Sequence, residues 1–255
     1  MIWKTFAGRC IHRDTQHKIQ VHQNLAYRWL TLGSDAIQSL ISRRHPERHG
    51  LEYIQALTLA ARINPGPSCL LGLGGAGVAH ALSPYLKNHV LDAIENNLGV
   101  IEVCSRYFLT EQIKNLHSIH QDALVYVQNS TTRYQHLMID LFNATSFPEH
   151  CNHAAFFGHC RRLLLPGGIL AINLANHHEQ RPVLMHIRAH FDQCTVAIPI
   201  KGTQNLVILA SKSSSKKPLL NMLEKQGLKH LIWDSHWGYV ASLTEGENTP
   251  WNFYL

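Results

Sequence analysis

Short apolar runs alternate with amphipathic stretches through the middle of the chain. The runs have the length of buried strands, and they lie at 68–73, 89–95, 116–120, 134–141 and 169–174. The stretches between and after them have helical spacing, and they lie at 76–86, 98–108, 122–128, 153–165 and 184–191. Strands that alternate with helices predict a parallel sheet with helical crossovers.

Two further runs, 195–200 and 206–210, follow each other with only a glycine-containing turn between them. Because no helix separates them, they predict an antiparallel hairpin at one edge of the sheet. The full pattern predicts a Rossmann-like α/β fold with a mostly parallel sheet of seven strands.

The two ends of the chain have different patterns from the middle. Two strand-like runs, 18–21 and 27–32, predict a small N-terminal β-hairpin unit within residues 1–50. A helix at 53–63 is expected to lead into the first core strand of a catalytic domain at 51–211. The polar stretch SKSSSKK then begins a linker and C-terminal extension, 212–255.

A glycine-rich turn follows the first core strand and precedes a helix. Its residues Gly72, Gly74, Gly75 and Gly77 lie within GLGGAG, which fits G-x-G-x-x-G. Glycines permit a tight turn and a close approach to a ligand, and the following helix N-terminus favours anionic or polar groups. We therefore predict that this turn binds a nucleotide-type cofactor.

Three carboxylates follow three successive strands of the predicted sheet: Glu95, Asp122 and Asp140. Glu95 is positioned to accept hydrogen bonds from ribose hydroxyls, and Asp122, next to Ala123, from an adenine amino group or as a helix N-cap. Ligands of doubly wound sheets lie at the carboxyl ends of the strands. Three acids there favour a cationic adenosyl sulfonium over the pyrophosphate of NAD.

Composition narrows the class of protein. The chain has 255 residues, 45% of them hydrophobic and 16% charged, which predicts a globular protein and excludes disorder over most of its length. The net charge is +6, but lysines and arginines are dispersed, so a nucleic-acid partner is not expected.

Several other features bear on location. Six cysteines without a C-x-x-C pair indicate reduced thiols and a cytoplasmic protein. No apolar run has membrane-spanning length, no signal peptide is predicted, and the histidines and cysteines near 150–160 match no strong zinc pattern, so no metal is expected.

The order and spacing of these segments resemble the spermidine synthase (polyamine aminopropyltransferase) family, within the class I methyltransferase-like fold. The resemblance covers about residues 17–211. The segments that carry it are LLGLGGAG, VLDAIENNLGVIEVCSRYF, HQDALVYV, YQHLMIDLF and FFGHCRRLLLPGGILAINL.

The resemblance implies roles for matching positions. Asp140 matches the catalytic carboxylate of the family and Tyr53 a tyrosine near it. The family's acceptor acids are replaced by amides at Gln55 and Asn143, and an early glutamine position corresponds to His17. An acceptor pocket for a polyamine needs carboxylates to pair its ammonium groups, so the acceptor is open.

Three hypotheses follow. The first is a transferase that moves an aminopropyl group from decarboxylated S-adenosylmethionine to a small amine or other acceptor. The second is an S-adenosylmethionine-dependent methyltransferase on the same fold, and the third is a degenerate binding protein without catalysis. The resemblance also implies a homodimer.

Overall fold

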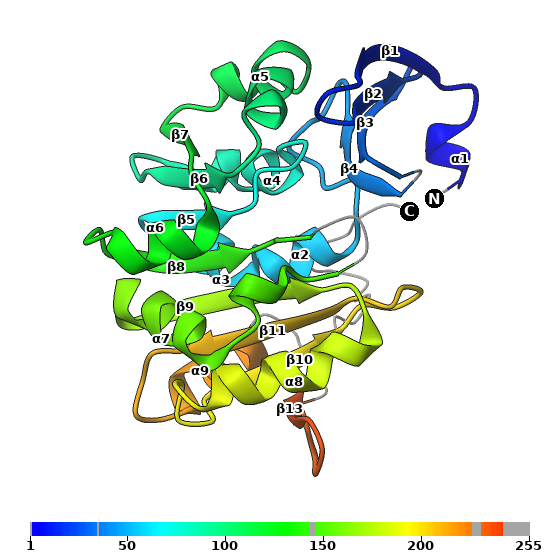
Figure 1. Cartoon of the computed structure of the whole chain (residues 1–255). Coiled ribbons are helices and arrows are strands. Elements are labelled where there is room, and N and C mark those ends of the chain that lie inside the picture. The colour runs from blue at the N-terminus through cyan, green and yellow to red at the C-terminus, as the bar shows by residue number, and fades with distance from the viewer. Residues whose placement is uncertain (1, 35, 143–145, 226–230, 242–255) are drawn as a thin grey trace.

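The computed structural model describes residues 2–34, 36–142, 146–225 and 231–241. Two sheets make up its framework (Figure 1). A small antiparallel sheet lies at the N-terminus, and a larger sheet flanked by helices forms the body of the protein.

The large sheet has the strand order β12-β13-β10-β11-β9-β8-β5-β6-β7. The strands are β5 (Ser68–Leu71), β6 (Leu91–Glu95), β7 (Leu116–His120), β8 (Tyr134–Ile139), β9 (Leu164–Leu174), β10 (Thr195–Pro199), β11 (Leu206–Ser211), β12 (Ile232–Asp234) and β13 (Gly238–Val240). Strands β7, β6, β5, β8 and β9 are parallel, and β11 is antiparallel to both β9 and β10.

Helices cover both faces of this sheet, because its central strands bury apolar side chains on both sides. They are α2 (Tyr53–Leu57), α3 (Leu59–Ile63), α4 (Gly77–Leu86), α5 (Leu98–Tyr107), α6 (Ala123–Asn129), α7 (Ala154–Leu163), α8 (His177–Arg188) and α9 (Lys217–Lys225). Two short 3-10 helices, η1 (Thr110–Gln112) and η2 (Glu149–Cys151), and α1 (Ile2–Thr5) complete the described helical elements.

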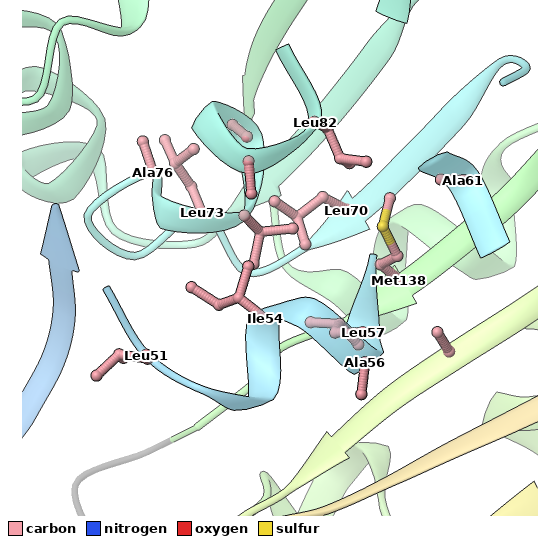
Figure 2. Close-up of a cluster of buried hydrophobic side chains, with 14 of the residues drawn as sticks. Leu51, Ile54, Ala56, Leu57, Ala61, Leu70, Leu73, Ala76, Leu82 and Met138 are labelled. Atoms are coloured by element: carbon pink, nitrogen blue, oxygen red, sulfur yellow. The ribbon is translucent and has the colours of Figure 1, made fainter. Parts of the chain in front are cut away.

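One apolar core lies between the sheet and α2, α3, α4, α5 and α9, and the other between the sheet and α6, α7 and α8. Figure 2 shows part of the first core, where Ile54 and Leu57 of α2 meet Leu70 of β5 and Met138 of β8. Helix α2 also contacts β9 and β11, and Tyr53 at its start lies within hydrogen-bond distance of Asp140, which follows β8.

The N-terminal sheet consists of β1 (Arg9–Asp14), β2 (Ile19–Gln23), β3 (Tyr27–Leu32) and β4 (Ile37–Ser42), in that order. Alternation buries one of its faces, which includes Ile19, Val21 and Leu40, in the first core. The small sheet therefore packs against α4 and α5, beside the glycine turn.

The predicted Rossmann-like α/β fold with a small N-terminal β unit is confirmed, with several differences in its parts. The described residues form nine strands in the large sheet rather than seven, because β13 pairs in parallel with β10 and β12 pairs with β13. The β10–β11 hairpin therefore does not end the sheet. Strands β1, β4, β12 and β13 were missed.

Helix boundaries also differ from the prediction. The expected helix 53–63 is interrupted at Thr58, whose Oγ1 donates to the Ile54 carbonyl at 2.7 Å. Helix α8 begins at His177, seven residues before the predicted start, because the exposed Pro182 is tolerated within it. Strand β9 begins at Leu164, since a bulge absorbs the expected Pro-Gly-Gly break.

Membrane-spanning helices and cysteine oxidation state bear on where in the cell the protein is found. In the part of the chain that the structure describes, no helix combines the length and apolarity needed to cross a bilayer. All six cysteines are free thiols, five of them buried.

Truncation of Phe157 tests the second core. Phe157 of α7 is fully buried, so Phe157→Ala is expected to lower the free energy of unfolding by about 3–5 kcal/mol. Urea unfolding followed by circular dichroism measures this change. Leu25→Ala, at a site 93% exposed, is the control, with an expected change within about 0.5 kcal/mol. A similar small change for Phe157→Ala would show that the core is assigned wrongly.

Candidate functional site

A cavity of about 430 Å³ opens where the carboxyl ends of the parallel strands meet the N-terminal sheet. Its floor is formed by residues that follow or end strands: Gly72 and Gly74 after β5, Glu95 of β6, Asp140 after β8, and Asn173 of β9. This is the position at which doubly wound folds bind ligands. The structure thus brings four of the predicted site residues, Gly72, Gly74, Glu95 and Asp140, together with Tyr53, to one cavity.

The Asp140 carboxylate is held by two donors at the base of this cavity. The Tyr53 hydroxyl donates to its Oδ2 at 2.8 Å, and the Asn173 Nδ2 donates to its Oδ1 at 3.0 Å. Asn205 donates in turn from its Nδ2 to the Asn173 Oδ1 at 2.8 Å. The carboxylate is thereby fixed in one orientation, with its remaining lone pairs available to a ligand.

The titration of Asp140 is set by two opposing effects. Burial raises the pKa of Asp140, whereas the hydrogen bonds from Asn173 and Tyr53 lower it without fully cancelling the effect of burial. Burial and the adjacent carboxylate raise the pKa of the Tyr53 hydroxyl well above its usual range. Tyr53 therefore stays protonated and donates, while Asp140 is a better base than an exposed carboxylate.

The glycine turn and Glu95 form a second part of the cavity. Glu95 Oε2 accepts from the backbone N–H groups of Leu73 and Gly74 at 3.1 and 3.4 Å, and Glu95 Oε1 from that of Asn97 at 3.0 Å. Burial raises the pKa of Glu95, and these backbone donors oppose the rise. The turn orients the carboxylate toward the cavity that it lines, as a ribose-binding acid requires.

The four glycines of the turn have two different environments. At Gly72, with φ of +95°, a Cβ would lie 2.4 Å from the Asp140 carbonyl oxygen, whereas at Gly74 it would meet nothing within 4 Å. Both line the cavity. Gly75 and Gly77 instead face Ser39 of β4, at 2.7 and 3.1 Å from their ideal Cβ positions. Their contribution is the close packing of the turn against the N-terminal sheet.

Asp122 lies beside the main cavity, in a separate pocket of about 30 Å³ that Ala123 and His150 also line. Its Oδ1 caps α6 by accepting from the Val125 N–H at 3.0 Å, and its Oδ2 lies 2.9 Å from the His150 Nε2. Burial raises the pKa of Asp122, but these partners outweigh it, so its pKa lies below the usual value. The pocket has room for about one water molecule, so a purine ring needs His150 to move.

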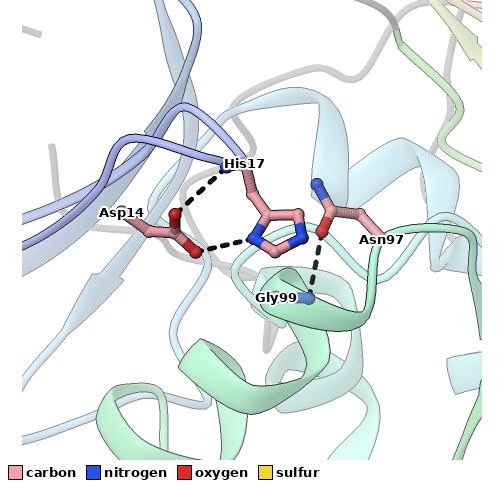
Figure 3. A network of polar contacts seen from close by, with 4 residues as sticks. All are labelled: Asp14, His17, Asn97 and Gly99. Atoms are coloured by element: carbon pink, nitrogen blue, oxygen red, sulfur yellow. Dashed lines mark hydrogen bonds and ion pairs between the residues drawn. The ribbon is translucent and has the colours of Figure 1, made fainter.

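The N-terminal sheet lines the cavity with Leu32, Ile37 and Gln38, and its turn between β1 and β2 contacts the start of α5. Figure 3 shows the His17 ring between Asp14 and the start of α5, with the His17 Nδ1 at 2.7 Å from the Asp14 Oδ2. A Cβ on Gly99 would lie only 3.0 Å from the same nitrogen. His17 therefore packs against the helix start whose N-cap, Asn97, lines the cavity.

The predicted acceptor residues are not both placed at the cavity. Gln55 is half-buried on α2 and does not line it, although its carbonyl accepts from the Arg62 Nη2 at 2.7 Å. Asn143 lies outside the described residues. Asn173, Asn205 and Thr203 line the cavity instead, and sequence reasoning missed them.

Position along the strands was the available signal for Asn173, because it lies near the carboxyl end of β9. Asn205 precedes β11, which runs antiparallel and so begins at the same edge of the sheet. Thr203 could not be predicted from its position along a strand, since it lies in the hairpin turn. Among the described residues no group of three or more metal-ligating side chains occurs.

Comparisons with known proteins find relatives that cover most of the chain. The chain is 25% identical over 207 residues to a polyamine aminopropyltransferase of Neisseria meningitidis, covering 79% of each chain. The chain is thus similar to polyamine aminopropyltransferases over about four fifths of its length. A polyamine aminopropyltransferase of Chromobacterium violaceum is 24% identical over 217 residues, which covers 84% of this chain and 83% of the relative. A scan against models of protein families finds no match.

Solved structures give the same fold. A probable spermidine synthase from Corynebacterium glutamicum superposes with a TM-score of 0.67 at 16% identity, covering 87% of this chain and 86% of the other. A spermidine synthase in complex with the transition-state analogue AdoDATO has a TM-score of 0.63 at 14% identity and 82% and 75% coverage. Human methyltransferase-like protein 13, in complex with SAH, has a TM-score of 0.58 at 20% identity and 72% and 96% coverage. The class I methyltransferase-like fold is therefore confirmed.

Gly72→Ala tests the close approach at the glycine turn. The new Cβ would collide with the Asp140 carbonyl, and alanine would have to adopt a left-handed φ. We therefore expect at least about tenfold weaker binding of methylthioadenosine, the thioether that remains when decarboxylated S-adenosylmethionine loses its aminopropyl group. Isothermal titration calorimetry measures the affinity. Gly167→Ala is the matched control, because its φ is +73° but nothing lies within 4 Å of its Cβ. Equal affinities in the two variants would contradict the assignment.

His150→Ala tests the small pocket. Removal of the imidazole frees the Asp122 Oδ2 and widens the space beside it, so the affinity for methylthioadenosine should rise about fivefold, the value of one hydrogen bond. The same titration measures it. His45→Ala, which removes a histidine paired with Glu47 away from both cavities, should leave the affinity unchanged. Weaker binding in His150→Ala would mean that His150 contacts the ligand.

Proposed function

We propose that the chain is an aminopropyltransferase that uses decarboxylated S-adenosylmethionine and an amine acceptor. The observation that carries the proposal is the buried Asp140, held by Tyr53 and Asn173 next to a glycine turn and Glu95. Its support from the comparisons is the similarity to curated polyamine aminopropyltransferases over four fifths of the chain.

The residues present fit this co-substrate. Gly74 leaves open space where the adenosine would approach the turn, and Glu95 accepts from ribose hydroxyls. The main cavity takes the sulfonium and its propyl chain, whereas the adenine end requires the pocket beside Asp122 to widen. When bound, decarboxylated S-adenosylmethionine supplies an electrophilic carbon and a neutral thioether leaving group.

Asp140 performs the proton chemistry in this proposal. The amine nitrogen forms a bond to the propyl carbon, the carbon–sulfur bond breaks with its electron pair on sulfur, and the nitrogen proton passes to the Asp140 carboxylate. Since the thioether is a good leaving group, no acid catalysis is needed at sulfur. Tyr53 and Asn173 keep the carboxylate aligned with the amine, which lowers the entropic part of the barrier.

The nature of the cavity wall favours the decarboxylated co-substrate. Of the residues described around the main cavity, none is a lysine, arginine or histidine. The carboxylate of S-adenosylmethionine would therefore have no cationic side chain to pair with. The carboxylate side chains of the cavity suit the decarboxylated form, which has an ammonium group and no carboxylate.

A methyltransferase on the same fold is the second candidate. It is favoured by the fold shared with human methyltransferase-like protein 13 and by the neutral amides of Asn173 and Asn205, which line the cavity with Asp140. Release of S-adenosylhomocysteine from S-adenosylmethionine, in place of methylthioadenosine from the decarboxylated form, would support it.

Homodimer formation and a cytoplasmic location remain predictions. The free cysteines support a reducing compartment. Sedimentation velocity of the purified protein measures the oligomeric state.

Asp140→Asn tests the proton acceptor. The amide keeps the shape of the side chain but takes no proton, so kcat should fall by about 10²–10⁴, with the affinity for methylthioadenosine changed less than a few-fold. Methylthioadenosine release from decarboxylated S-adenosylmethionine in the presence of an amine panel measures kcat. Asp192→Asn, on an exposed carboxylate paired with Arg161, is the control. Undiminished turnover in Asp140→Asn would exclude the carboxylate as the base.

Tyr53→Phe tests the cause of the Asp140 titration. The lost donor no longer lowers the pKa of Asp140, so that pKa rises further above the ordinary value. Because the charged form accepts the proton, the acid-side limb of kcat against pH should move to higher pH by about 1–2 units, the value of a hydrogen bond to a charged group. A limb at the wild-type position would show that another group controls it.

A further inference from the structure

The acceptor half of the cavity can be located from the order of the strands. Glu95 ends β6 on one side of the glycine turn, whereas Asn173 of β9 and Asn205 before β11 lie beyond Asp140 on the other side. Since the adenosine occupies the side with Glu95, the acceptor approaches Asp140 from the side of β9 and β11. We call Asn173, Thr203 and Asn205 the amide wall.

The amide wall has hydrogen-bonding groups but no charge. The Asn173 amide is occupied by Asp140 and Asn205, and the Thr203 Oγ1 donates to the Ile200 carbonyl at 3.0 Å. The Oδ1 of Asn205 has no hydrogen-bond partner within the described part of the chain. Ala175 and Phe142 add apolar surface that suits a short methylene chain. The wall therefore offers an acceptor oxygen and apolar contact, but no counter-ion.

The charged groups of the cavity are few compared with those of a diamine and its co-substrate. The described residues around the main cavity include three carboxylates, those of Glu52, Glu95 and Asp140. Glu95 is used by the ribose and the glycine turn, and Asp140 by the attacking amine. Glu52, half-exposed and 3.9 Å from the Lys4 Nζ, is left for one ammonium. With a diamine acceptor the cavity holds two ammonium groups besides the attacking amine, one on the co-substrate and one at the far end of the diamine.

Among the described residues, one of those two ammonium groups would find no carboxylate partner, and a desolvated, unpaired charge is costly. A neutral hydroxyl at the far end of the acceptor avoids this cost and can donate to the Asn205 Oδ1. We infer that the acceptor is a primary amine with an uncharged, hydrogen-bonding tail, such as an amino alcohol, rather than a diamine. This inference rests on the proposed aminopropyl transfer.

The reaction balances with such an acceptor. The neutral amine nitrogen displaces the thioether from the propyl carbon, the sulfur keeps the electron pair of the broken bond, and Asp140 takes one proton. The products are methylthioadenosine and a secondary amine that carries an aminopropyl group at one end and the hydroxyl at the other.

The test compares two acceptors of equal length, 4-aminobutan-1-ol and putrescine, which differ only in a terminal hydroxyl or ammonium. With decarboxylated S-adenosylmethionine, wild-type kcat/KM should be at least about tenfold higher for the amino alcohol, one misplaced charge being at least that costly. Equal or higher kcat/KM for putrescine would overturn the inference. This holds even if the preference for putrescine comes from Asp35, which lies outside the described residues.

A matched pair of variants gives the converse test. Thr203→Asp adds a carboxylate to the amide wall and keeps an oxygen that can accept from the Asn205 N–H, as Thr203 does at 3.1 Å. Thr203→Asn has the same shape without the charge. The Asp variant should shift the preference at least about tenfold toward putrescine, since it supplies the missing counter-ion, and the Asn variant should not. Unchanged affinity for methylthioadenosine controls for folding, and an equal response of both variants contradicts the inference.

Failure of the proposed function is separately visible. If no amine releases methylthioadenosine, aminopropyl transfer is wrong, whatever the acceptor. Calorimetric titration of the two amines into protein saturated with methylthioadenosine then still compares their binding. Preferential binding of 4-aminobutan-1-ol supports the neutral-tail inference, and preferential binding of putrescine, or binding of neither, refutes it.

Discussion

The Asp140 carboxylate has to be held in place where water reaches it poorly, and the rest of the site is arranged around that requirement. Burial raises its pKa, and hydrogen bonds from two neutral donors, Tyr53 and Asn173, limit the free-energy cost of burying its charge. The donors come from a helix and a strand far apart in the sequence. The geometry around Asp140 therefore depends on the packing of α2 against the large sheet, including β9 and β11.

The same packing explains the composition of the glycine turn. Gly72 passes so close to the Asp140 backbone that no side chain fits, while Gly75 and Gly77 permit β4 to pack closely. The turn thus joins three parts: the parallel sheet, the carboxylate and the N-terminal sheet. Its backbone also supplies the N–H groups that orient Glu95. In the proposed function, binding of the adenosyl group and positioning of the base are consequently linked through one short segment.

Much of this arrangement could be predicted from sequence, because local signals encode it. Strand periodicity, the glycine pattern and acids at strand ends identified Gly72, Glu95 and Asp140, which all line the cavity. Asn173 and Asn205 could not be predicted in the same way, since their roles depend on β11 running antiparallel beside β9. The His150 contact with Asp122 joins residues 28 positions apart in sequence and also has no local signal.

The predicted helix and strand boundaries were wrong where local residue preference and tertiary packing disagreed. Pro182 and the Pro-Gly-Gly segment both favour breaks, yet α8 continues through the first and β9 through the second. The short strands β12 and β13 lack a strong apolar pattern and form because β10 provides an edge to pair with.

The most direct test of the account is calorimetric titration of the purified protein with decarboxylated S-adenosylmethionine and, in parallel, with S-adenosylmethionine. The cavity has carboxylates but no cationic side chain among its described residues, so the decarboxylated form should bind at least about tenfold more tightly. Tighter binding of S-adenosylmethionine would contradict aminopropyl transfer and favour a methyltransferase. Binding of neither would contradict every catalytic assignment made for the glycine turn and Asp140.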